Sequence, residues 1–214
     1  MKIKTLLTML MVCALSSFVY AQQETNTMMD TEMDSMTNID EPAMNEMPTD
    51  DSIDDESLDE SPSAVQAIAI IEGTKEDSEL YGEVEFTETK DGLSVTAEVY
   101  NAPPGKHGIH VHEKGSCEEA GNAAGGHFNP DGVDHGMVSK DGLAKAHVGD
   151  LGNIEVDEYG DGYLTSFIPG ASLTQGKYNV TGKAVILHEK EDDMSQPTGN
   201  AGIRIGCGVI ETAE

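Results

Sequence analysis

The residues in this sequence best suited to chemistry are its histidines. All seven lie between positions 107 and 188. His110 and His112 are separated by one residue, and in a β-strand this spacing places both imidazoles on one face, with the apolar neighbours on the other. Imidazole is the commonest metal ligand among side chains. The pair therefore predicts a metal site on one face of a strand.

A second group of candidate ligands follows along the chain. His127, His135 and His147 are accompanied by Asp150, three residues after the last of them. Three imidazoles and one carboxylate form a closed tetrahedral set, which is typical of a structural zinc ion rather than of an open catalytic one.

His188 follows an apolar run and offers a further imidazole. Together with His110, His112 and one imidazole shared with the second group, it provides four nitrogen atoms, which suit Cu(II) in a distorted square plane. For any single histidine, a hydrogen-bonded or surface role is the alternative. The pattern as a whole predicts two neighbouring metal sites of different character.

Short β-strands must position these ligands. From residue 64 onward, β-rich runs alternate with turn signals at close spacing, which is typical of an antiparallel sandwich or barrel with few and short helices. Asp91 and Gly92 supply the positive-φ residues of a hairpin turn. Two glycine-rich stretches, 118–140 and 189–202, exceed the length of hairpin turns and are predicted to be functional loops. The expected strands are 65–71, 81–87, 93–99, 106–113, 144–148, 164–168, 183–187 and 203–210.

The charge and the cysteines limit the possible functions further. The sequence carries 40 acidic and 12 basic residues, a formal charge of −28, whereas nucleic-acid binding needs clustered Lys and Arg. Nucleic acid is therefore not an expected partner. Cys117 and Cys207 predict one disulfide if the protein is exported. A reactive thiol or a thiolate metal ligand is the alternative, although Cys117 lacks a second cysteine at zinc-finger spacing.

The N-terminus indicates export. Lys2 and Lys4 precede a largely apolar stretch, and Val19 and Ala21 fit a small-residue cleavage site. Residues 1–21 are therefore predicted to be a secretory signal peptide, with no membrane span after its cleavage and a periplasmic or secreted mature protein. A retained membrane span, or a lipid anchor at Cys13, is the alternative.

The next segment, 22–63, has a composition unlike that of the rest of the chain. It contains 14 acidic residues, six methionines and no Lys or Arg. It cannot form a hydrophobic core, so it is predicted to be a disordered tail that precedes a single domain at 64–214. A solvating acidic spacer is the favoured interpretation. Capture of Cu(I) by the methionine thioethers, which are soft ligands, is the alternative.

At this point the sequence resembles the copper/zinc superoxide dismutases, and the resemblance covers the whole predicted domain. The motifs that carry it occur in the order found in that family: GIHVHE at 108–113, GHFNP at 126–130, HVGDLGN at 147–153, HEK at 188–190 and GNAGIRIGCGVI at 199–210. The resemblance implies a Greek-key β-barrel enzyme. Its expected reaction is the dismutation of superoxide to dioxygen and hydrogen peroxide by alternating reduction and oxidation of copper, with zinc structural.

The resemblance also assigns the metal ligands. It implies copper on His110, His112, His127 and His188. It implies zinc on His127, His135, His147 and Asp150. In this assignment His127 bridges the two metals as an imidazolate, and each of its ring nitrogens serves one metal.

Several other roles follow from the resemblance. Arg204 is expected to bind the anionic substrate beside the open copper position, and His127 is expected to supply a proton. Asp192 matches the carboxylate that links a copper-side histidine to a zinc-side one, where it fixes their ring orientations. Thr198 matches the threonine that narrows the substrate channel. The family's intrasubunit disulfide corresponds to Cys117 and Cys207.

Some features differ from animal members of the family. The stretch from His188 to Arg204 is short and contains Lys190 as its only lysine, so a long, lysine-bearing electrostatic loop is missing. This favours the bacterial secreted or periplasmic type. Glu211 and Thr212 stand where animal enzymes have apolar dimer contacts, which leaves a homodimer as a possible rather than a required assembly.

The substrate and the charge of the domain impose one more expectation. The predicted domain carries 26 acidic and 10 basic residues, although superoxide is an anion. Attraction must therefore be local, and Arg204 and Lys190 are expected to provide it. A non-catalytic copper/zinc storage or transfer module of the same fold is the alternative function; such a module would lack a copper ligand or Arg204.

Overall fold

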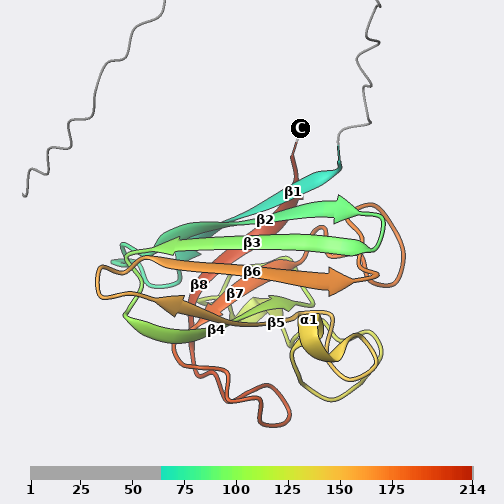
Figure 1. Cartoon of the computed structure of the whole chain (residues 1–214). Coiled ribbons are helices and arrows are strands. Elements are labelled where there is room, and N and C mark those ends of the chain that lie inside the picture. The colour runs from blue at the N-terminus through green and yellow to red at the C-terminus, as the bar shows by residue number, and fades with distance from the viewer. Residues whose placement is uncertain (1–63, 214) are drawn as a thin grey trace, which may run out of the picture. The chain divides into compact units, whose positions relative to one another are not determined.

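The structure is a computed structural model that describes residues 64–213. The predicted signal peptide and acidic tail lie outside the described residues. Eight antiparallel strands close into a barrel in the order β1-β2-β3-β6-β5-β4-β7-β8 (Figure 1). The chain crosses from β3 to β4 and from β6 to β7, which are not neighbours in the barrel, and these crossings form the Greek-key pattern. The predicted fold class is therefore confirmed.

The regular elements are short, as expected. The strands are β1 (Gln66–Gly73), β2 (Tyr81–Thr89), β3 (Gly92–Tyr100), β4 (Gly105–His112), β5 (Asp150–Val156), β6 (Gly162–Pro169), β7 (Ala184–His188) and β8 (Arg204–Thr212). The helices in the described residues are the four-residue α1 (Val138–Asp141) and one 3₁₀ turn (Asn122–Ala124). No helix in this part of the chain is long and apolar enough to cross a membrane.

Alternation of apolar and polar residues explains why a segment such as β2 forms a strand. In β2, Val84 and Phe86 are fully buried, while Glu83, Glu85 and Thr87 lie on the other face. In the same way, every second side chain of the other strands points into the barrel, and its interior is packed with aliphatic side chains and Phe86. At the turn between β2 and β3, Thr89 pairs with Gly92, and Gly92 alone takes the positive φ that the sequence suggested for two residues.

Two strands, β4 and β7, are buried on both faces. Ile109 and Val111 of β4 enter the main core, whereas His110 and His112 lie on the opposite face with exposed fractions of 0% and 1%. The long loops cover this second face. A separate apolar cluster forms beneath them, made by Ala124, Ala184, Ile186 and Cys207. The outer face of β4 and β7 is therefore an enclosed platform for the histidines.

Two long connections carry the remaining candidate residues. They are 113–149, between β4 and β5, and 189–203, between β7 and β8. The predicted strand at 144–148 is wrong, because this segment is part of the first connection. The N–H groups of Lys145 and Ala146 both donate to the Gly142 carbonyl, and the His147 N–H donates to Asp150 Oδ2, so local turn bonds replace a strand ladder.

Candidate metal centre

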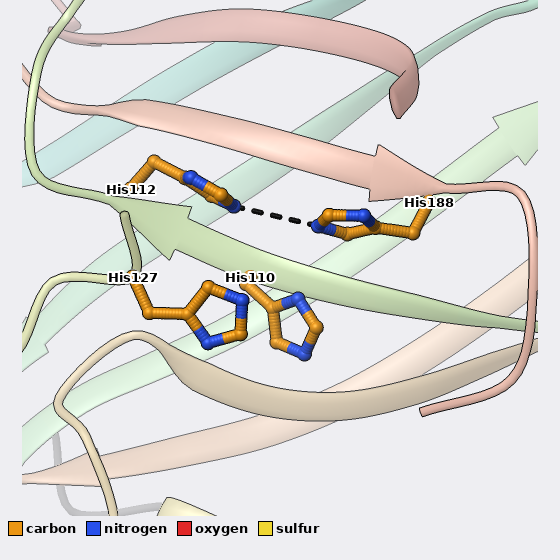
Figure 2. A group of neighbouring side chains, drawn as sticks. All are labelled: His110, His112, His127 and His188. Atoms are coloured by element: carbon orange, nitrogen blue, oxygen red, sulfur yellow. Dashed lines mark hydrogen bonds between the residues drawn. The ribbon is translucent and has the colours of Figure 1, made fainter. Parts of the chain in front are cut away.

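Irregularities in the strand pairing set the directions of the histidine side chains in the candidate metal centre. The β4–β5 register shifts between Ile109 and His110, and the β7–β8 register shifts between Leu187 and His188. Such shifts re-aim side chains next to functional sites. His127, in the first long connection, pairs with His112 through an isolated β-bridge. Segments far apart in the sequence thereby bring four imidazoles together (Figure 2).

The candidate copper set is His110, His112, His127 and His188, each buried and each offering a nitrogen within 4.8 Å of the others. His112 Nδ1 donates to the Gly125 carbonyl at 3.0 Å, and His188 Nδ1 donates to the Gly202 carbonyl at 3.2 Å. Because a carbonyl only accepts, these contacts leave both Nε2 atoms as lone-pair acceptors in the neutral rings. The two Nε2 atoms face each other at 3.4 Å (Figure 2).

This arrangement fits a metal cation. Burial lowers the pKa of His110 to about 3, that of His112 to about 2 and that of His188 to about 4, so the rings are neutral at physiological pH. His110 Nε2 donates to Asp192 Oδ2 at 2.7 Å, which leaves its buried Nδ1 without a hydrogen-bond partner among the described residues. Converging, unprotonated lone pairs are stabilised by a cation between them, and nitrogen donors of this kind suit copper.

The candidate zinc set surrounds one buried carboxylate. Asp150 Oδ1 lies 2.9 Å from His127 Nδ1 and 3.0 Å from His147 Nδ1, and Asp150 Oδ2 lies 2.9 Å from His135 Nδ1. Burial raises the pKa of Asp150, but the close contacts with the three histidines outweigh this effect and hold it far below its usual value. Three imidazoles and one carboxylate at this spacing match a closed tetrahedral zinc site.

The pKa of His135 also indicates a site built for positive charge. Burial lowers this pKa, but the carboxylates of Asp150 and Asp192, 2.9 Å from its two ring nitrogens, outweigh the burial and raise it to about 9. The two carboxylates therefore stabilise a cation at this position. A metal ion that replaced the proton would receive the same stabilisation.

His127 belongs to both sets. Its Nδ1 lies on the side of Asp150, and Figure 2 shows its other ring nitrogen turned toward His112 and His188. One imidazole thus separates two four-ligand groups, with a nitrogen available to each.

Asp192 connects the two sets from a second direction. Its carboxylate accepts from His110 Nε2 at 2.7 Å and from His135 Nε2 at 2.9 Å. Asn153 holds the backbone of Asp192, because its Nδ2 donates to the Asp192 carbonyl at 2.9 Å and its Oδ1 accepts from the Asp192 N–H at 2.7 Å. Sequence reasoning did not single out Asn153, although it lies at the end of the HVGDLGN motif.

Gln196 is a second residue that sequence reasoning missed. Its side-chain amide makes two hydrogen bonds of 2.9 Å with the backbone N–H and carbonyl of His135. This amide ties the second long connection to the first at a candidate zinc ligand. No sequence signal marked it, because the two residues are 61 positions apart.

Arg204 begins β8 and lies beside the copper set. Its guanidinium donates to the carbonyls of Gly121 and Gly125, the latter at 2.5 Å, so two loop carbonyls fix its orientation. Arg204 and Thr198 line a cavity of about 630 Å³ together with His112, His127 and His188. Lys190, which was expected to attract the substrate, does not line this cavity.

The structure contains the disulfide between Cys117 and Cys207. It joins the first long connection to β8 three residues after Arg204. The Gly125 carbonyl on the same connection accepts from both Arg204 and His112. The disulfide therefore anchors the loop whose carbonyls orient the arginine and one candidate copper ligand.

Fold and site together define a class of protein: an eight-stranded Greek-key barrel with two adjacent four-ligand metal sets that share one histidine. Comparison with known proteins agrees with this description. The family model for copper/zinc superoxide dismutase (SODC) matches residues 80–210. The chain belongs to the copper/zinc superoxide dismutase family. It is a copper/zinc superoxide dismutase with a histidine copper site and a histidine/aspartate zinc site.

Similar proteins support the assignment. The chain is 39% identical over 150 residues to an extracellular Cu-Zn superoxide dismutase of Caenorhabditis elegans, covering 67% of this chain and 66% of that protein. It is 40% identical over 157 residues to the extracellular enzyme of Drosophila melanogaster, covering 68% and 84%. The crystal structure of the clock protein EA4 matches with a TM-score of 0.61 and 38% identity, covering 70% of this chain and 95% of that one.

Proposed function

We propose that this chain dismutes superoxide with the residues assigned as follows. His110, His112, His127 and His188 would hold copper, and His127, His135, His147 and Asp150 would hold zinc. The observation that carries the proposal is the shared His127, which offers one ring nitrogen to each set.

The overall reaction converts two superoxide anions and two protons to dioxygen and hydrogen peroxide. Copper, when bound, supplies the one-electron oxidation and reduction, and zinc supplies a fixed positive charge. The protein must therefore bind a small anion, deliver protons and keep the imidazoles oriented.

Arg204 would bind the anion. Its guanidinium is held by two carbonyls at the wall of the cavity that reaches His112, His127 and His188. A planar guanidinium offers several donors to a diatomic anion and keeps its charge at all relevant pH values. Thr198 lines the same cavity and would limit its width to small substrates.

His127 would hold and release a proton at Nε2. Its Nδ1 is engaged on the Asp150 side at 2.9 Å, so Nε2 is the nitrogen free to carry a proton toward the cavity. Asp192 would act as a positioning residue, since it holds the rings of His110 and His135 through their Nε2 atoms. These roles require buried, oriented imidazoles, as the low exposure of the rings provides.

The proposal includes the organisation and location of the protein. Residues 1–21 would be a cleaved signal peptide, 22–63 an acidic tail and 64–214 the enzyme domain. Export is supported by the relatives named extracellular and by the disulfide. The short connection 189–203 favours the bacterial periplasmic or secreted type, with superoxide as substrate and a homodimer as the possible assembly.

The experiment is a direct assay of the purified protein loaded with copper and zinc. Superoxide decay is followed by stopped-flow absorbance, with metal content measured on the same sample. The proposal expects catalysed decay that scales with bound copper. Full copper and zinc content without catalysis would instead favour a metal storage or transfer module.

A further inference from the structure

The cavity beside the copper set is lined by a basic residue that no sequence motif marks. Among its lining residues in the described part of the chain, two carry a positive charge, Arg204 and Lys75. Lys75 lies in the connection between β1 and β2, which is separate from the two long connections. Lys75 is solvent-exposed, and it lines this cavity at the β1–β2 loop.

Two hydrogen bonds fix the position of this loop relative to β8. Thr74 Oγ1 donates to the Arg204 carbonyl at 2.8 Å, and the Thr74 N–H donates to the Ile205 carbonyl at 3.0 Å. Lys75 is the next residue along the chain, and its carbonyl accepts from the Ser78 N–H at 3.1 Å. The backbone that carries Lys75 is thus attached directly to the backbone that carries Arg204.

The charge of Lys75 is available for an approaching anion. Lys75 makes no ion pair with any residue in 64–213, in contrast to Lys106 and Lys177, which pair with Glu191 and Asp131. The acidic side chains that follow it in the loop do not line the cavity.

An acidic protein needs such a local charge to capture an anionic substrate. The domain from residue 64 onward has 26 acidic and 10 basic residues, so its overall field repels superoxide. At physiological ionic strength, charges act over a screening length of about 8 Å, and the groups at the cavity mouth therefore dominate.

We propose that Lys75, on the β1–β2 loop, is a positioning residue for the substrate. Its positive charge attracts superoxide into the cavity toward Arg204. The proposal rests on the proposed function. It assigns to the β1–β2 loop the task expected of Lys190, which lies in the connection between β7 and β8.

The test compares Lys75→Gln and Lys75→Glu with the parent enzyme, and uses Lys90→Gln as the matched control. Lys90 is an exposed lysine in the β2–β3 turn, 4.0 Å from the Asp91 carboxylate, and it does not line the cavity. All four proteins are loaded with copper and zinc, and their metal contents are compared. Two quantities are measured as a function of ionic strength: kcat/KM for superoxide, and the Kd of azide from its visible spectrum with copper.

For a charge acting across about 10 Å of water, removal changes the local anion concentration about twofold, and reversal about fourfold. At low ionic strength we therefore expect kcat/KM to fall and the azide Kd to rise by about these factors in Lys75→Gln and Lys75→Glu, respectively. The differences should vanish near 1 M salt, where the screening length is about 3 Å. Lys90→Gln should match the parent.

Equal values for the Lys75 variants and the parent at low salt would overturn the proposal. So would a loss that persists at high salt, or an equal loss in Lys90→Gln. If the parent enzyme itself showed no activity, the proposed function would fail, and the azide titration would still decide whether Lys75 attracts anions to the cavity.

Discussion

The contact between Gln196 and His135 provides a test of how the two long connections build the zinc site. The Gln196 amide accepts from the His135 N–H and donates to the His135 carbonyl, both at 2.9 Å. Gln196→Ala removes both hydrogen bonds and leaves the zinc ligands themselves unchanged. A net contribution of about 0.5–1.5 kcal/mol for each bond gives a loss of about 1–3 kcal/mol.

The metal-free protein has the same two hydrogen bonds, so part of this free energy is lost from its folding stability and not from zinc binding. We therefore expect the zinc Kd to rise about tenfold, which corresponds to about 1.4 kcal/mol. The assay is competition for zinc with a chromogenic chelator. Gln175→Ala is the matched control, because Gln175 is an exposed glutamine whose side chain makes no hydrogen bond with the described residues.

The reasoning would be refuted by a zinc Kd for Gln196→Ala that equals those of the parent and Gln175→Ala. A lower melting temperature with an unchanged zinc Kd would show that the amide stabilises the fold and does not position His135.

Three further changes test other parts of the site. Asp150→Ala removes the carboxylate at the centre of the zinc set, so zinc content should fall more than copper content; equal loss of both metals by elemental analysis would contradict two separate sites. Arg204→Glu should lower the catalytic rate at least about tenfold with metal content unchanged, since local charge attracts the anion; an unchanged rate would remove Arg204 from the mechanism. Cys207→Ser opens a link across 90 residues and should lower the melting temperature of both metal-free and metal-loaded protein, with an upper figure of about 4–5 kcal/mol in stability; an unchanged melting temperature would show that the bridge adds no stability.

The sequence predicted the barrel because its signals are local. The alternation of apolar and polar residues in β2 and β3, and the glycine at the β2–β3 turn, act within a few residues of the chain. The two-residue spacing of His110 and His112 likewise determines a shared face wherever the strand is placed. Local patterns of this kind do not depend on contacts with distant segments, so they can be recognised in the sequence alone.

The prediction of a strand at 144–148 was wrong because hydrogen bonds to a side chain determine the backbone conformation of this segment. The Asp150 carboxylate accepts from the N–H groups of Gly136 and His147, which draws the chain into a turn around the zinc set. An apolar pattern alone does not reveal such a competing hydrogen bond.

Contacts between distant segments were also beyond prediction from the sequence. Asn153 holds Asp192 across 39 residues, and Gln196 holds His135 across 61. Which lysine faces the cavity depends on the paths of two separate loops, and for this reason Lys190 was expected there and Lys75 was not.

Whether His127 is shared by two metals can be seen directly in a crystal structure of the copper- and zinc-loaded protein, with anomalous diffraction recorded at the absorption edges of both metals. We expect a copper peak among His110, His112, His127 and His188. A separate zinc peak is expected among His127, His135, His147 and Asp150, with His127 between the two. A single metal position, or two peaks without His127 as a common ligand, would disprove the two-metal centre.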